Sequence, residues 1–128
     1  MATVIHTGLP KGLVDRIRKA PAFFKLKESD IEDYFVNRVR SMGGEVRKVK
    51  WIGRRSAPDR VAMIPMQRDE FGNTKVMRLP YPVTLWVELK RPGEGPRPDQ
   101  QREHKRMRDV GQHVVVIDSF AGVDALLA

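Results

Sequence analysis

The stretch Val83–Lys90, VTLWVELK, combines a strand pattern with two charged side chains at its end. Successive residues of a strand point to opposite faces, so one face is wholly apolar and the other ends in Glu88 and Lys90. A carboxylate and an ammonium where a buried strand emerges are costly unless they are paired, hydrated or bound to a metal. The stretch therefore predicts a central strand that ends either in a simple ion pair or in a site with a chemical role.

The size and charge of the chain indicate one basic globular protein. Its 128 residues allow one modest hydrophobic core, and a hydrophobic fraction of 41% argues against disorder along the whole length. Lys and Arg number 24 against 16 Asp and Glu, which gives a net charge of +8. Nucleic acid is the partner that this charge favours, because neutralising phosphates releases counterions. Charges that only solvate the protein are the other interpretation.

Features that the sequence lacks narrow the class of protein further. The chain has no cysteine, which excludes disulfides, thiolate metal ligands and a cysteine nucleophile. No apolar run approaches the roughly 18 residues of a membrane span, and no signal-peptide core opens the chain. We therefore expect a cytoplasmic protein without a membrane partner.

Residues 1–27 form a basic segment in which six Lys and Arg residues face one Asp. Leu13, Val14 and Ile17 predict a short amphipathic helix that Pro21 ends. We expect an arm that contacts nucleic acid or a second subunit, with a solvated tail as the alternative. Residues 28–128 would then form the folded domain.

The rest of the chain alternates helix and strand patterns, which predicts a small α/β domain. Ser29 is placed to cap a helix whose apolar residues recur at helical spacing until Gly43-Gly44. Strands are expected over 45–52 and 61–64, and a hairpin or long loop over 67–82.

Three further elements follow the strand that ends at Lys90. A proline-rich loop leads into a charged helix over 99–110. His113–Ile117 is a continuous apolar run, as expected of an interior strand covered on both faces. Ser119 can cap a last helix that buries apolar residues near the end of the chain.

A second carboxylate, Asp59, precedes the 61–64 strand. Neighbouring strand ends can bring it together with Glu88 and Lys90. Carboxylate oxygens suit Mg²⁺, and a bound metal lowers the pKa of water and screens charge on a phosphate. Lys90 could orient that water or stabilise the transition state. The same short motifs recur at Pro98-Asp99 and Glu103-x-Lys105, but outside predicted strands, and no buried strand is expected beneath Glu103.

Three polar residues have both a functional and a structural interpretation. Glu32 lies at the margin of the apolar stripe, yet Ser29-x-x-Glu32 is also a capping box, in which Glu32 only closes the helix start. Gln100 opens the helix after the proline-rich loop, where an amide can bind a phosphate oxygen or a metal-bound water. Gln101, the next residue, is the alternative candidate for this role. His104 is expected to be a structural or surface histidine.

Two basic clusters flank the candidate site. Such runs are usually solvated faces, but two clusters beside one site favour contact with phosphates. Trp51 could stack on a base, although a core or interface position is commoner for tryptophan. The basic residues that we expect to bind nucleic acid are Lys48, Lys50, Arg54, Arg55, Arg102 and Arg106.

One ordered set of residues resembles the virus-type replication–repair nuclease (VRR-NUC) domain of the PD-(D/E)xK superfamily. The set comprises Glu32, Pro58-Asp59, Glu88-Leu89-Lys90, Gln100, and Gly111 before an apolar strand. The resemblance covers roughly residues 28–120. It implies a restriction-endonuclease-like α/β fold, with a mixed central sheet flanked by helices, and hydrolysis of DNA that depends on Mg²⁺ or Mn²⁺.

The resemblance also implies roles for single residues. Asp59, Glu88 and the backbone carbonyl of Leu89 would hold the metal, and Lys90 would be the catalytic lysine. Glu32 would match the acid on the family's first helix and act on the metal directly or through water. Gln100 would match the glutamine on the helix after the lysine.

Three positions depart from the family pattern. Ser56 and Arg91 stand where the family usually has a glycine, and Arg60 follows Asp59 where an apolar residue is common. None of the three removes a group that the resemblance assigns to catalysis.

Stand-alone members of this family are compact, often from phage, and dimeric. The implied substrate is therefore branched or four-way junction DNA, cut by a homodimer inside a phage-infected or bacterial cell. The rival hypothesis is a non-catalytic DNA-binding module of the same fold. A third is a basic subunit of a larger assembly, docked through residues 1–27.

Overall fold

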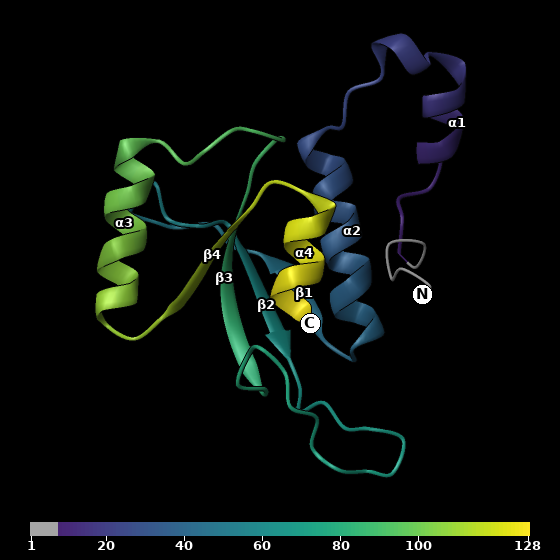
Figure 1. Cartoon of the computed structure of the whole chain (residues 1–128). Coiled ribbons are helices and arrows are strands. Elements are labelled where there is room, and N and C mark those ends of the chain that lie inside the picture. The colour runs from purple at the N-terminus through teal and green to yellow at the C-terminus, as the bar shows by residue number, and fades with distance from the viewer. Residues whose placement is uncertain (1–7) are drawn as a thin grey trace.

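The computed structural model describes residues 8–128 and contains a four-stranded mixed sheet between helices (Figure 1). The strands are β1 (Glu45–Lys48), β2 (Arg60–Ile64), β3 (Val83–Leu89) and β4 (His113–Ile117), in the order β1-β2-β3-β4. The first two pairings are antiparallel, and β3 pairs with β4 in parallel. A parallel pair needs a crossover, and here helix α3 (Pro98–Asp109) supplies it.

Helices cover the two faces of the sheet unequally. Helices α2 (Glu28–Ser41) and α4 (Phe120–Leu127) contact each other on one face, and α3 packs beside β4 on the other side (Figure 1). The main hydrophobic core lies under α2 and α4 and includes Ile31, Phe35 and Val123, all fully buried. Burying such side chains stabilises the fold by about 1.5–3 kcal/mol each.

The strand pattern expected for VTLWVELK is confirmed. Val83, Leu85, Val87 and Leu89 all belong to the core under α2 and α4. Glu88 and Lys90, on alternate positions, are also buried, at 9% and 6% exposure. A carboxylate and an ammonium are therefore buried at the end of β3, as the sequence of residues 83–90 indicated.

Two of the strand expectations are wrong in detail. His113–Ile117 forms the edge strand β4, not an interior strand, and Val116 is 37% exposed. The strand is apolar because α3 covers part of one face of β4 and the main core covers part of the other. The edge of β4 away from β3 pairs with no described strand. Strand β1 ends at Lys48 rather than at residue 52, and a loop without regular structure leads from it to β2.

The start of α2 also differs from the expected cap. The helix begins at Glu28, and Asp30 accepts a hydrogen bond from the backbone N–H of Lys27 at 2.8 Å. Ser29 is therefore inside the helix, and the capping box of Ser29 with Glu32 does not form. The end of the helix is as expected: Gly43 has a φ of 83°, which favours glycine.

Within the described part of the basic arm, residues 8–27, helix α1 (Leu13–Lys19) and a 3-10 helix η2 (Pro21–Phe23) precede α2. The short helix and its end at Pro21 were expected from the sequence. Arg16 ties the arm to α2 through an ion pair with Asp30 at 2.6 Å, and Leu13 is buried. The first seven residues of the expected arm lie outside the described residues.

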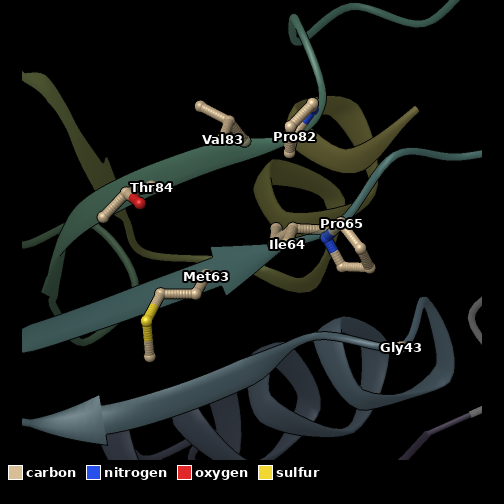
Figure 2. A pocket seen from close by; sticks show the side chains of 7 residues that line it. All are labelled: Gly43, Met63, Ile64, Pro65, Pro82, Val83 and Thr84. Carbon is tan, nitrogen blue, oxygen red and sulfur yellow. The ribbon is translucent and has the colours of Figure 1, made fainter.

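Residues 65–82 form the long loop that was expected between β2 and β3, with one isolated bridge between Arg68 and Thr74. At the base of this loop, a hollow of about 570 Å³ lies between the end of β2 and the start of β3 (Figure 2). Its lining includes Met63, Pro65 and Pro82 but no ionisable side chain, so it offers no acid–base or metal chemistry. Among the described residues, no helix is long and apolar enough to cross a membrane.

Candidate active site

The strand register brings Asp59 and Glu88 together at the end of the sheet opposite that hollow. Arg60 pairs with Val87 in the antiparallel β2–β3 ladder, so the next pair outward is Asp59 with Glu88. Asp59 itself still pairs with the strand on the other side of β2, since Val49 N–H donates to the Asp59 carbonyl at 2.8 Å and extends the β1–β2 pairing by one residue. Residues directly opposed in an antiparallel pair point to the same face. The two carboxylates therefore share one face at the end of adjacent strands.

Glu88 is in an unfavourable environment for a negative charge. Burial raises the pKa of Glu88, Lys90 opposes this, and the charges of Asp59 and Glu28 raise it further, to about 7. Asp59 is the outer acid, with its side chain 63% exposed. The site thus combines one buried and one accessible carboxylate whose charges repel.

Lys90 continues β3 by one residue. Its backbone N–H donates to the Ile117 carbonyl at 2.9 Å, which extends the parallel pairing with β4. Within residues 8–128, the Lys90 ammonium lies within 4 Å of no carboxylate, although its charge acts on Glu88. The structure therefore does not contain the simple surface ion pair of Glu88 with Lys90 that was one interpretation of the sequence.

His104, expected to be a structural or surface histidine, is a buried residue that lies beside Glu88. It lies on α3, is 1% exposed, and places Nε2 at 3.5 Å from Glu88 Oε1 without a hydrogen-bond partner among the described residues. Burial lowers the pKa of His104, and Arg108 and Lys90 lower it further, so the ring is neutral near pH 7. The contact with Glu88 is consequently not an ion pair. His104 lies one helical turn after Gln100, so both side chains leave α3 on the same face.

Glu32 lies on α2 and is bonded to Arg60, the first residue of β2. Arg60 Nε donates to Glu32 Oε2, and Arg60 Nη1 lies 3.1 Å from Asp59 Oδ1. Burial lowers the pKa of Arg60, but the Glu32 bond and the Asp59 charge raise it overall, which keeps the guanidinium charged. Glu28, one turn before Glu32, is the acid of α2 that acts on Glu88. Neither Arg60 nor Glu28 was given a role in the site from the sequence.

The structure distinguishes the two glutamines at the start of α3. Gln100 is 7% exposed, and its Oε1 accepts a hydrogen bond from the Arg97 backbone N–H at 3.0 Å. Gln101 is exposed and donates to the Pro96 carbonyl. Of the pair, only Gln100 faces the interior, on the same side of α3 as His104.

No three His, Asp or Glu side chains converge as a ready-made metal site within residues 8–128. The ligand set that the family resemblance implies, Asp59 and Glu88 with the carbonyl of Leu89, thus has two acidic side chains and stays a prediction. Glu32 is engaged by Arg60 instead of being directed at a free position.

A basic cavity of about 260 Å³ lies between the loop before Asp59 and helix α3. Glu103 anchors two of its arginines: this carboxylate is 5% exposed and binds Arg54 at 2.6 Å and Arg106 at 2.9 Å. Arg55 and Arg102 make no ion pair with any described residue. Four of the six expected DNA-binding residues thus meet in one cavity, whose lining is Gly53, Arg54, Arg55, Ser56, Asp99, Arg102 and Arg106.

The acids of the two duplicate motifs have structural roles at this cavity. Glu103 lies on helix α3, outside the strands as expected, and is buried as the ion-pair partner of Arg54. Ser56, with a φ of 66°, donates a hydrogen bond to Asp99 from a backbone conformation that favours glycine. That bond and Arg97 lower the pKa of Asp99 well below its usual range. Asp99 and Glu103 therefore hold the loop before Asp59 in place.

The remaining basic residues lie outside the cavity. Lys48 and Lys50 are exposed at the end of β1 and just after it. Trp51 is partly buried, donates from Nε1 to the Pro58 carbonyl at 2.7 Å and packs against Trp86 at 5.2 Å between ring centroids. Its position beside the Pro58-Asp59 turn agrees with a structural tryptophan.

Two comparisons relate the chain to known proteins. A protein of Acyrthosiphon pisum secondary endosymbiont phage 1, named "Putative nuclease p44", is 38% identical over 94 residues, which are 73% of this chain and 85% of the relative. A solved structure described as "VRR_NUC domain" aligns with a TM-score of 0.59 and 33% identity, over 77% of this chain and 91% of that one. No profile of a known protein family matches the chain.

The mixed sheet between helices, with acids and a lysine at one end, is the architecture of a restriction-endonuclease-like nuclease fold. The similarity in sequence and in structure makes the assignment more specific. The chain belongs to the VRR-NUC family. The family and the fold class expected from the sequence are thereby confirmed, and the roles of single residues stay predictions.

Proposed function

We propose that this protein is a divalent-metal-dependent DNA endonuclease that acts as a homodimer on branched or four-way junction DNA. The observations that support the catalytic part are the β2–β3 register, in which Asp59 and Glu88 are each the next residue beyond the Arg60–Val87 pair, and the effect of the charges of Asp59 and Lys90 on the pKa of Glu88. Membership of a nuclease family supports the substrate class. The preference for junctions and the dimer rest on the family resemblance.

The donor set fits Mg²⁺ or Mn²⁺. Burial, with repulsion from Asp59 and Glu28, raises the pKa of Glu88 despite the opposing charge of Lys90, so a hard cation bound at the pair would stabilise its charged form. Asp59, Glu88 and the Leu89 carbonyl would hold the ion. When bound, the ion supplies an acidified water and a positive charge beside the scissile phosphate.

The chain's own groups then have distinct tasks. A water oxygen loses a proton to solvent and forms a bond to phosphorus, while the bond from phosphorus to the leaving sugar oxygen breaks and that oxygen takes up a proton from solvent. Negative charge grows on the phosphoryl oxygens in the transition state. Lys90 places an ammonium where that charge grows. Gln100 Oε1 accepts a hydrogen bond from the Arg97 backbone N–H at the start of α3. Its NH₂ group is then left to donate to a water or a phosphate oxygen.

The basic cavity gives a test of DNA binding apart from cleavage. Arg55→Gln/Arg102→Gln is expected to reduce the slope of log K against log salt concentration by about two, because each lost phosphate contact removes about 0.9. Binding is measured by fluorescence anisotropy in EDTA. Arg40→Gln, an exposed arginine in the last turn of α2, is the matched control and should leave the slope unchanged. An unchanged slope in the double variant would remove this cavity from the DNA path.

Metal removal tests the catalytic proposal directly. Linear, flapped and four-way DNA are incubated with the purified protein in EDTA and across a Mg²⁺ titration. We expect no nicking in EDTA, nicking that saturates with Mg²⁺, and faster cutting of the four-way substrate. Binding without nicking at every Mg²⁺ and Mn²⁺ concentration would instead support the non-catalytic DNA-binding module.

The basic arm is proposed to border the path of the DNA. A groove of about 780 Å³ separates residues 24–26 of the arm from the loop 91–94, which directly follows Lys90. Both walls carry a basic side chain, Lys25 and Arg91. We propose residues 1–27 as this arm and residues 28–128 as the nuclease domain.

A further inference from the structure

Arg60 is a cation set among the acids of the site. It donates from Nε to Glu32 Oε2, lies 3.1 Å from Asp59 Oδ1, and also donates to the Asp59 carbonyl at 3.2 Å. Its side chain is only 15% exposed. Arg60 therefore joins an acid on α2 to the outer acid of the Asp59–Glu88 pair.

The fold explains how one side chain reaches both acids. Arg60 is opposed to Val87, whose side chain faces the core under α2, so Arg60 also leaves the sheet on the α2 face, toward Glu32. Asp59 is the preceding residue at the free end of β2, within reach of the same guanidinium. A planar guanidinium has five N–H donors and can serve several oxygen acceptors at once.

We infer that Arg60 occupies the place of a second metal ion, so that the site binds one divalent cation and Glu32 acts through Arg60. This inference rests on the proposed function. Arg60 balances the charge of Glu32, and one divalent ion balances Asp59 and Glu88, which leaves the Lys90 ammonium for the phosphate. A second ion between Glu32 and Asp59 would have to displace the guanidinium from both.

Arg60 is thus a positioning residue that also sets the number of metal ions. A purely structural link between α2 and β2 would have no effect on that number. The count of bound ions is therefore the readout that separates the two roles.

The test is a Mn²⁺ titration of the full chain without DNA, followed by electron paramagnetic resonance and by calorimetry. The wild type is expected to bind one Mn²⁺ per chain. Arg60→Gln removes the charge, frees Glu32 and is expected to bind two. Arg60→Lys keeps the charge and should bind one, and Arg60→Gln/Glu32→Gln should return to one.

The outcomes separate this inference from the proposed function. Two ions in the wild type, or one ion in a folded Arg60→Gln variant, would overturn the role of Arg60 and leave a metal-dependent nuclease intact. No ion in the wild type would overturn both. Circular dichroism checks that each variant is folded, and if Arg60→Gln does not fold, Arg60→Met, which keeps the aliphatic stem without the charge, is counted in its place and is likewise expected to bind two.

Discussion

Lys90→Ala is expected to lower the rate of DNA cleavage by about a thousandfold and to leave DNA affinity within about twofold. Removing a preorganised charge or donor from the developing phosphoryl charge costs roughly 10²–10³ in rate, and the upper end applies because Lys90 is a buried cation beside Glu88 that forms no ion pair with a described carboxylate. The ammonium forms no ion pair within residues 8–128, so its loss breaks no salt bridge of the described fold. Single-turnover cleavage in saturating Mg²⁺ measures the effect.

The matched control is Lys105→Ala, which removes the same charge from the exposed side of α3, where Lys105 pairs with Asp109. It should cleave at nearly the wild-type rate. Since Lys90 lowers the pKa of Glu88, Lys90→Ala should also move the pH profile of metal binding upward. Wild-type cleavage by Lys90→Ala would refute the catalytic assignment.

Glu88→Gln is expected to change activity and stability in opposite directions. Cleavage should fall below detection, because one of the two carboxylates proposed to hold the metal is lost. The metal-free variant should nevertheless be more stable above pH 7, by about 1–3 kcal/mol, since each unit of pKa shift corresponds to about 1.4 kcal/mol.

The sign follows from proton binding. The pKa of Glu88 is about 7 in the folded chain, against 4.5 for an ordinary glutamate. Between these pH values the folded state holds a proton that the unfolded state has released, so the free energy of unfolding decreases as the pH rises from 4.5 to 7. Well above pH 7, the contribution of protonated Glu88 to the free energy of unfolding is lost completely. The amide of the Glu88→Gln variant does not ionise, so this part of the pH dependence would disappear.

Urea unfolding in EDTA at pH 5 and pH 8 checks this expectation. The wild type should lose stability between the two pH values relative to Glu88→Gln, and Mn²⁺ should restore stability to the wild type alone. Glu94→Gln, a partly exposed acid in the loop after Lys90, serves as the control. A Glu88→Gln variant less stable than the wild type at pH 8 would contradict the proposed electrostatics of the site.

Local patterns were sufficient for most of the secondary structure. The strand at Val83–Leu89, the helix that ends at Gly43 and the cap of α4 by Ser119 all follow from side-chain periodicity and turn chemistry. The capping box at Ser29 failed because Asp30, one residue later, provides the same kind of hydrogen bond to Lys27. The interior position of β4 failed because a run of apolar residues cannot show which strand is at the edge.

The sequence by itself determined that a buried strand would end in a carboxylate and a lysine, and that an acid would stand at the start of a neighbouring strand. Alternation along a strand and the order of motifs depend only on neighbouring residues, so they can be read from the chain. Tertiary structure alone decided that His104 meets Glu88, that Glu103 anchors Arg54, and that Arg60 joins Glu32 to Asp59. These contacts join residues far apart in the chain, and they form only because the sheet register and the placement of α2 and α3 bring their side chains together.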